Sequence, residues 1–144
     1  ADSSLAYADC FGDYYSTGLY MWGFYFMEFT AKVQLYIEVM CQSNELEIPT
    51  GLFSATDDKA SDGALLIGCV EEDVDGLYDA YSWYTQLATE SQEAATAPIV
   101  DGVMKISYDE ASDTYSVTLD LKDDADNSIT AHYEHRIILE DFRI

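Results

Sequence analysis

The sequence predicts an all-β protein, built as an antiparallel barrel or sandwich of eight or nine short strands. Three observations support this fold class. Apolar residues recur at every second position in several runs, as they do where one face of a strand is buried. Turns rich in Asp and Asn separate these runs at short intervals. Helix signals are scarce, because only residues 84–95 have a helix-forming composition, and their apolar residues do not recur at helical spacing.

Four runs show the alternation most clearly. In one of them, Tyr115, Val117, Leu119 and Leu121 share one face, since side chains two residues apart in a strand point the same way. The four runs cover residues 33–41, 103–108, 115–121 and 129–139. Weaker strands are expected at residues 5–11, 19–29, 51–55, 64–70 and 77–85.

Turn chemistry separates these strands. Residues 109–113 form a hairpin loop of about five residues. Residues 122–128 form another, with Asp126 and Asn127 at its tip, because both residue types tolerate left-handed backbone conformations. The chain reverses at Ala31 and Lys32, and residues 44–49 and 57–63 have the composition of loops. No linker or βαβ spacing interrupts this pattern, so residues 1–144 are expected to form a single domain.

The charge of the chain is strongly negative. Twenty-eight Asp and Glu residues stand against six Lys and Arg, which gives a formal net charge of −22. This charge repels phosphate groups and anionic membrane surfaces, so we expect no direct binding of nucleic acid. Two interpretations stay open: the acidity keeps an aromatic-rich surface soluble, or the protein mimics nucleic acid and inhibits a partner with a basic groove. No apolar run approaches the ~18 residues that span a bilayer.

The three cysteines, Cys10, Cys41 and Cys69, do not form a complete disulfide framework, because their number is odd. Cys41 continues the apolar face of residues 33–39, and Cys69 continues that of residues 65–67. Both are therefore predicted to be small buried apolar residues, with a Cys41–Cys69 bridge as the alternative. The chain begins at Ala1 without Met, which suggests a processed N-terminus. We expect an exported protein whose signal, and any lipid anchor, lie upstream.

Several motifs resemble those of a known family. They are Ala8-Asp-Cys-Phe-Gly-Asp-Tyr-Tyr15, the hairpin of residues 25–40, Ile48-Pro-Thr-Gly-Leu-Phe53, Asp101-Gly-Val-Met-Lys-Ile-Ser107, Asp113-Thr-Tyr-Ser-Val-Thr-Leu-Asp-Leu121 and Asp123-Asp-Ala-Asp-Asn127. Together they resemble the calycin-like, or lipocalin-like, β-barrel domains in envelope lipoproteins of Bacteroides-type gut bacteria. Two positions depart from the family pattern: Tyr133-Glu-His135 stands where a Tyr-x-Gly is usual, and Asp126 where a Gly is usual.

The resemblance implies an up-and-down barrel of about eight strands. It also implies a location in the bacterial cell envelope, at the outer membrane surface or in the periplasm. The family has no established activity, so the resemblance implies no active site and no cofactor. A β-sandwich is the alternative fold.

The sequence offers little support for catalysis or metal binding. His132 and His135 are the only histidines, and three residues apart in a strand they point to opposite faces, so we expect no metal site there. No serine lies in a Gly-x-Ser-x-Gly elbow. Paired carboxylates would allow glycoside hydrolysis, which is a less favoured alternative. The acidic stretches at residues 73–76 and 123–127 lack a complete calcium-binding pattern and are interpreted as solvated turns.

Aromatic residues give the most specific hypothesis. Residues 19–29 are apolar on both faces, so something must cover each face: core on one side, and on the other a ligand cavity, a partner or a neighbouring segment. A second aromatic cluster lies at residues 78–84. We therefore expect a non-catalytic binding or structural module for a small apolar or carbohydrate ligand, or for a protein partner. The predicted ligand-binding residues are Tyr20, Trp22, Tyr81 and Trp83.

Overall fold

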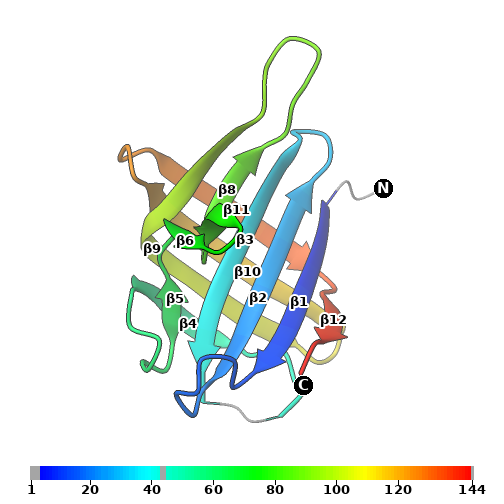
Figure 1. Cartoon of the computed structure of the whole chain (residues 1–144). Helices are drawn as coiled ribbons and strands as arrows, with labels where there is room; N and C mark the ends of the chain where they lie inside the picture. The colour runs from blue at the N-terminus through cyan, green and yellow to red at the C-terminus, as the bar shows by residue number, and fades with distance from the viewer. Residues whose placement is uncertain (1–3, 43–44, 144) are drawn as a thin grey trace.

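The computed structural model describes residues 4–42 and 45–143, and this part of the chain is all-β, with no helix. Its twelve strands follow one another with short connections (Figure 1). They are β1 (Ser4–Gly12), β2 (Tyr20–Glu28), β3 (Val33–Cys41), β4 (Gly51–Thr56), β5 (Ala64–Leu66), β6 (Cys69–Asp73), β7 (Gly76–Ala80), β8 (Trp83–Gln86), β9 (Ala95–Asp109), β10 (Thr114–Asp123), β11 (Ser128–His135) and β12 (Ile138–Asp141).

The strand pairing confirms a β barrel. Two antiparallel meanders, β1–β2–β3 and β9–β10–β11, form most of the wall. Between β3 and β9, β8 bridges the two meanders at one end, and β4 with β5 bridges them at the other. The strands β3, β5, β4, β9 and β8 therefore form a closed ring of five, to which the other strands of the main sheet are added.

Two pairings in this sheet are parallel, β1 with β12 and β4 with β5. The structure also has more strands than the eight or nine expected, because three predicted strands are each divided in two. Gly68 lies between β5 and β6, and a Cβ at that position would stand only 2.1 Å from the carbonyl oxygen of Ser82. Tyr81, between β7 and β8, has a left-handed φ of 69° and turns the chain away from its strand direction. The last predicted strand bends at residues 136–137. Its first part, β11, pairs with β10, and its second part, β12, pairs with β1.

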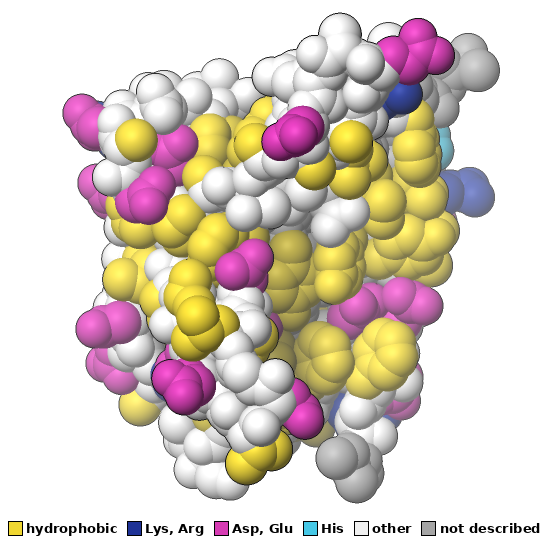
Figure 2. Space-filling model, turned by 45° about the horizontal axis from the view of Figure 1, so that its top comes forward, with side chains coloured by type: hydrophobic (Ala, Val, Ile, Leu, Met, Phe, Trp, Pro, Cys, Tyr) yellow, Lys and Arg dark blue, Asp and Glu magenta, His cyan; other side chains and the backbone are white. Residues whose placement is uncertain are grey.

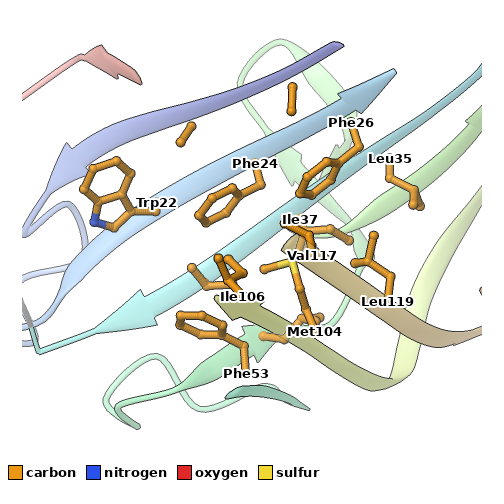
Figure 3. Close-up of a cluster of buried hydrophobic side chains, with 14 of the residues drawn as sticks. Trp22, Phe24, Phe26, Leu35, Ile37, Phe53, Met104, Ile106, Val117 and Leu119 are labelled. Carbon is orange, nitrogen blue, oxygen red and sulfur yellow. The ribbon is translucent and has the colours of Figure 1, made fainter. Parts of the chain in front are cut away.

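The barrel interior is filled by the inward faces of the strands. Along β2, Trp22, Phe24 and Phe26 lie in a row, and Figure 3 shows them opposite side chains from β9 and β10. Trp22 and Phe24 are fully buried, and the rings of Phe24 and Phe26 stack with centroids 6.1 Å apart. The predicted alternation is confirmed in β10, where Val117, Leu119 and Leu121 are buried and the residues between Val117 and Leu121 are exposed.

A second, smaller apolar cluster covers the outer face of β2 and β3. It consists of Met21, Met40, Ala64 and Leu66, with Phe11, Tyr15, Leu19 and Tyr81 packed against it. The prediction that both faces of residues 19–29 are covered is therefore confirmed for Met21. A neighbouring segment of the same chain provides this cover.

The cysteine predictions are only partly right. Cys10 and Cys41 are buried, but Cys69 is exposed, and no disulfide joins any two of these three residues. The apolar face that Cys69 was expected to continue ends with β5, and Cys69 already belongs to β6 in the separate β6–β7 hairpin. The alternative of a Cys41–Cys69 bridge is therefore wrong.

The predicted hairpin turns are confirmed. Lys32, Asp113 and Asp126 have positive φ values of 55°, 54° and 64° and reverse the chain where the sequence indicates it. Residues 57–63 form a loop between β4 and β5, as expected. Residue 44, the first residue of the predicted loop 44–49, lies outside the described residues.

A cavity at the open end of the barrel

In the part of the chain that the structure describes, the barrel wall is incomplete at the end where β1 begins. Of the two strands beside this gap, β1 pairs with β12 from Tyr7 to Cys10, and this pairing does not extend to the first residues of β1. On the other side of the gap lies β11, which among the described residues pairs only with β10. An opening therefore separates the first residues of β1 from β11.

A cavity of about 390 Å³ lies at this end of the barrel. Its lining comes from β1, β2, β3, β8, β10 and β11, so residues distant in sequence meet around it. The apolar and aromatic lining residues are Phe26, Met27, Val33, Leu35, Tyr84, Leu119, Ile129, Ala131 and Tyr133, and the polar ones are Ser4, Glu28, Ser128, Thr130 and His132. The volume lies in the ordinary range for small-molecule sites, roughly 300–1,000 Å³.

Rigid rings define the inner end of the cavity. The ring of Phe26 packs against that of Tyr133, with centroids 5.8 Å apart. The Tyr133 hydroxyl donates a hydrogen bond to the carbonyl oxygen of Arg136, where the chain bends between β11 and β12. Tyr84 also packs against the core, and its hydroxyl donates to Oε1 of Gln86 at 3.3 Å. These bonds fix the aromatic side chains of the lining.

The polar groups lie at the rim. Ser4 donates a hydrogen bond to Glu28 at 2.9 Å, which joins the ends of β1 and β2. His132 is exposed, with Nε2 3.3 Å from a carboxylate oxygen of Glu134 and Nδ1 3.2 Å from the hydroxyl of Thr118. Among the described residues that line the cavity there is no Lys or Arg, and Glu28 is the one carboxyl group. Most of the lining is therefore apolar or uncharged.

The four predicted ligand-binding residues do not meet in one place. Trp22 belongs to the core and Tyr20, which is partly buried, packs against it. The buried indole N–H of Trp22 has no hydrogen-bond partner among the described residues. Tyr81 lies in the outer apolar cluster. Trp83 is half-buried and donates its indole N–H to the Ala80 carbonyl at 2.8 Å. None of the four lines the cavity at the barrel end.

Half of the residues that line this cavity were predicted on the apolar faces of alternating strands. Leu119, Ile129 and Tyr133 belong to alternating runs of the sequence. Alternation gives the face on which a side chain lies but not the end of the barrel at which the wall opens. The position of the opening depends on where the chain stops pairing with β10 and begins to pair with β1. The sequence carries no local signal for this change of partner.

A carboxyl pair lies on the outer face where β12 joins β1. Asp9 is the pairing partner of Glu140, it is only 6% exposed, and its Oδ1 has no hydrogen-bond partner in the described part of the chain. Burial, together with the hydrogen bond and the like charge of Glu140, raises the pKa of Asp9 to about 7. Asp9 therefore keeps its proton to a higher pH than an ordinary aspartate does.

The acidic stretches considered for calcium stabilise turns. Asp73 accepts a hydrogen bond from the amide of Asp75 at 2.8 Å. Asp123 accepts bonds from the amides of Ala125 and Asn127 and from the Asn127 side chain, which lower its pKa. Within the described residues, no three His, Cys, Asp or Glu side chains are grouped so that they could hold a metal ion.

Comparisons with family models, curated proteins and solved structures return no match for this chain. The described residues include no helix long and apolar enough to cross a membrane. The fold and the site define a β-barrel protein with a cavity at one end of the barrel.

Proposed function

We propose that this protein is a non-catalytic binding module that holds a small, neutral, apolar ligand in the cavity at the open end of its barrel. The observation that carries the proposal is the cavity of about 390 Å³, lined mainly by apolar and aromatic side chains and reached through an incomplete wall. Apolar pockets with a few polar groups at the rim are typical of small-molecule sites.

The remaining interior supports a small ligand in preference to a large one. Trp22, Phe24 and Met104 fill the barrel beyond the cavity and are fully buried. Small barrels have interiors just wide enough for packed side chains or for one small ligand. A ligand would therefore rest on the ring of Phe26 and occupy only the end of the barrel.

The proposal also covers the family of the protein and its location in the cell. We propose a lipocalin-like, calycin-like domain of the bacterial cell envelope, exported to the outer membrane surface or the periplasm. The β barrel, its end cavity and the motifs of residues 101–127 support this proposal.

Binding can be tested with N-phenyl-1-naphthylamine, a neutral apolar dye that fluoresces on leaving water. We expect a saturable rise in fluorescence with the unmodified protein. Ala131→Trp places an indole in the cavity and should weaken binding at least about tenfold, since filling the space removes the apolar contacts. Ser107→Trp adds the same group on an exposed position of β9 and should leave binding unchanged.

Two results would contradict the proposal. One is the lack of a saturable signal from the folded, unmodified protein. The other is equal binding by the two tryptophan variants, because dye bound elsewhere on the surface would not respond to the cavity. Near-ultraviolet circular dichroism shows whether each variant keeps its packed core.

A further inference from the structure

A second pocket lies on the outer face of the barrel, away from the end cavity. The hairpin β6–β7 stands in front of β3 (Figure 1), and the segment 13–19 covers the neighbouring part of β2. Between them is a pocket of about 320 Å³. We call it the tyrosine pocket, and the residues used below are Tyr15, Tyr36, Glu38, Glu71, Tyr78 and Tyr81. Figure 2 shows apolar side chains, tyrosines included, beside acidic ones on a view that includes this face.

The floor of the tyrosine pocket holds a buried carboxyl group. Glu38 is 8% exposed, and its two oxygens accept hydrogen bonds from Tyr15 at 3.0 Å and Tyr36 at 2.8 Å. Gly23 makes room for this arrangement, because a Cβ there would stand 2.6 Å from the Tyr36 hydroxyl. Burial raises the pKa of Glu38, against the opposing effects of both tyrosines and of Lys59. Both donors are neutral, so they leave the carboxylate charge uncompensated.

A second carboxyl group forms part of the wall. Glu71 of β6 accepts hydrogen bonds from the hydroxyls of Tyr78 at 3.1 Å and Tyr81 at 3.2 Å. Asp79 also lines the pocket, and none of the lining residues is Lys or Arg. The pocket therefore combines aromatic rings with negative charge, the combination that attracts organic cations.

Lys59 makes cation–π contacts with two of the tyrosine rings. The ammonium nitrogen of Lys59 lies 4.5 Å from the ring centroid of Tyr81 and 5.3 Å from that of Tyr15. A hydrogen bond to Tyr81 raises the pKa of Lys59 and favours its charged form. The charge of Lys59 acts on Glu38 and is itself influenced by Glu71, while Asp79 lines the pocket as a third carboxyl group, so the site retains negative charge for a second cation.

We propose that the tyrosine pocket binds a small organic ammonium ion. The cation lies among the tyrosine rings with Glu38 beneath it and Glu71 beside it. Lys59 shares two of these rings and competes with the ligand. The site is separate from the barrel-end cavity and differs from it in chemistry, because one selects a positive charge and the other excludes net charge.

The probe is choline, compared with its uncharged isostere 3,3-dimethyl-1-butanol, in titrations followed by amide chemical shifts. We expect saturable shifts confined to β3, β6–β7 and the segment 13–19 with choline, and none with the alcohol. Glu38→Gln should weaken choline binding about tenfold or more, because it removes the buried charge. Glu72→Gln, an exposed change of the same charge on β6, should leave binding unchanged.

The variant Lys59→Met provides a test of opposite sign. Removing the competing ammonium should strengthen choline binding severalfold, and this holds even if Glu38→Gln fails to fold. Equal responses to choline and the alcohol would overturn the proposal, as would shifts scattered over the acidic surface. Equal effects of Glu38→Gln and Glu72→Gln, or unchanged or weaker binding by Lys59→Met, would overturn it as well. Dye binding at the barrel end should be the same in all these variants.

Discussion

The buried pair of Asp9 and Glu140 predicts that the folded protein loses stability as the pH rises through the weakly acidic range. The pKa of Asp9 is about 7 in the folded protein and 3.8 in its ordinary setting. Below pH 3.8 both the folded and the unfolded chain bind this proton. Between 3.8 and about 7 only the folded chain retains it, so each rise in pH favours unfolding. Above about 7 neither state holds it, and the contribution is lost.

The magnitude follows from the width of this window. One unit of pKa corresponds to about 1.4 kcal/mol, so a change from 3.8 to about 7 corresponds to about 4 kcal/mol at most. Burial is the largest cause of this rise, and the hydrogen bond and the charge of Glu140 add to it. On the neighbouring β2, burial raises the pKa of Tyr25, and the charges of Asp9 and Glu38 raise it further. Tyr36 places its neutral hydroxyl over Gly23.

Asp9→Asn isolates this effect. The amide can donate to the Glu140 carboxylate in place of the Asp9 carboxyl proton and does not ionise. Urea unfolding, followed by tryptophan fluorescence at pH values from 4.5 to 8, gives the free energy of unfolding of each protein. We expect the variant to be within about 1 kcal/mol of the parent near pH 4.5 and about 2–4 kcal/mol more stable at pH 8.

Asp120→Asn is the matched control, because Asp120 is exposed on β10 and lies outside the pair. It corrects for the general relief of repulsion in a chain of formal charge −22. A difference between Asp9→Asn and the parent that stays constant with pH would refute the reasoning. So would a variant that is less stable at pH 8, because the buried pair would then not repel.

Two further predictions concern packing and backbone conformation. Phe24→Ala should lower the free energy of unfolding by about 3–5 kcal/mol, measured by urea unfolding, whereas Leu52→Ala at a position 59% exposed should change it by less than about 1 kcal/mol. Gly102→Ala should lower it by at least about 2 kcal/mol, because φ is 118° and the new Cβ would stand 2.2 Å from the carbonyl oxygen of Asp120. Gly18→Ala, with φ of 86° but open space, should be milder; equal losses at both glycines would contradict the role of the contact.

Local patterns predicted the strands because alternation is a property of neighbouring residues. The span Val33–Cys41 was predicted with the bounds that β3 has. Of the buried positions of β10, Val117, Leu119 and Leu121 were predicted individually. The divisions within predicted strands were not foreseen. Tyr81 has a left-handed backbone although its residue type does not favour it, and Gly68 lies against Ser82 through a tertiary contact. Such breaks depend on packing between segments.

The predicted ligand-binding residues illustrate the same limit. Alternation placed Tyr20 and Trp22 on one face of β2, and the structure confirms that they share the interior. Alternation could not show that Trp22 lies deep in a filled core, or that Tyr81 packs on the opposite side of the barrel wall. Aromatic residues fit a core, a cavity or an outer cluster equally well, so their composition alone does not separate these environments.

The outer face of β3 extends this reasoning to charge. Alternation places Tyr36 and Glu38 on the face opposite to Leu35 and Ile37, where a carboxylate would be expected in water. Glu38 is buried instead, because the β6–β7 hairpin and the segment 13–19 fold over it. Burying a carboxyl group is unfavourable unless other groups compensate its charge. The two neutral phenols supply hydrogen bonds but no charge, and Lys59 is shared with Glu71. A cation in the tyrosine pocket would complete this compensation, which is why its binding should depend on Glu38 more than on any exposed acid.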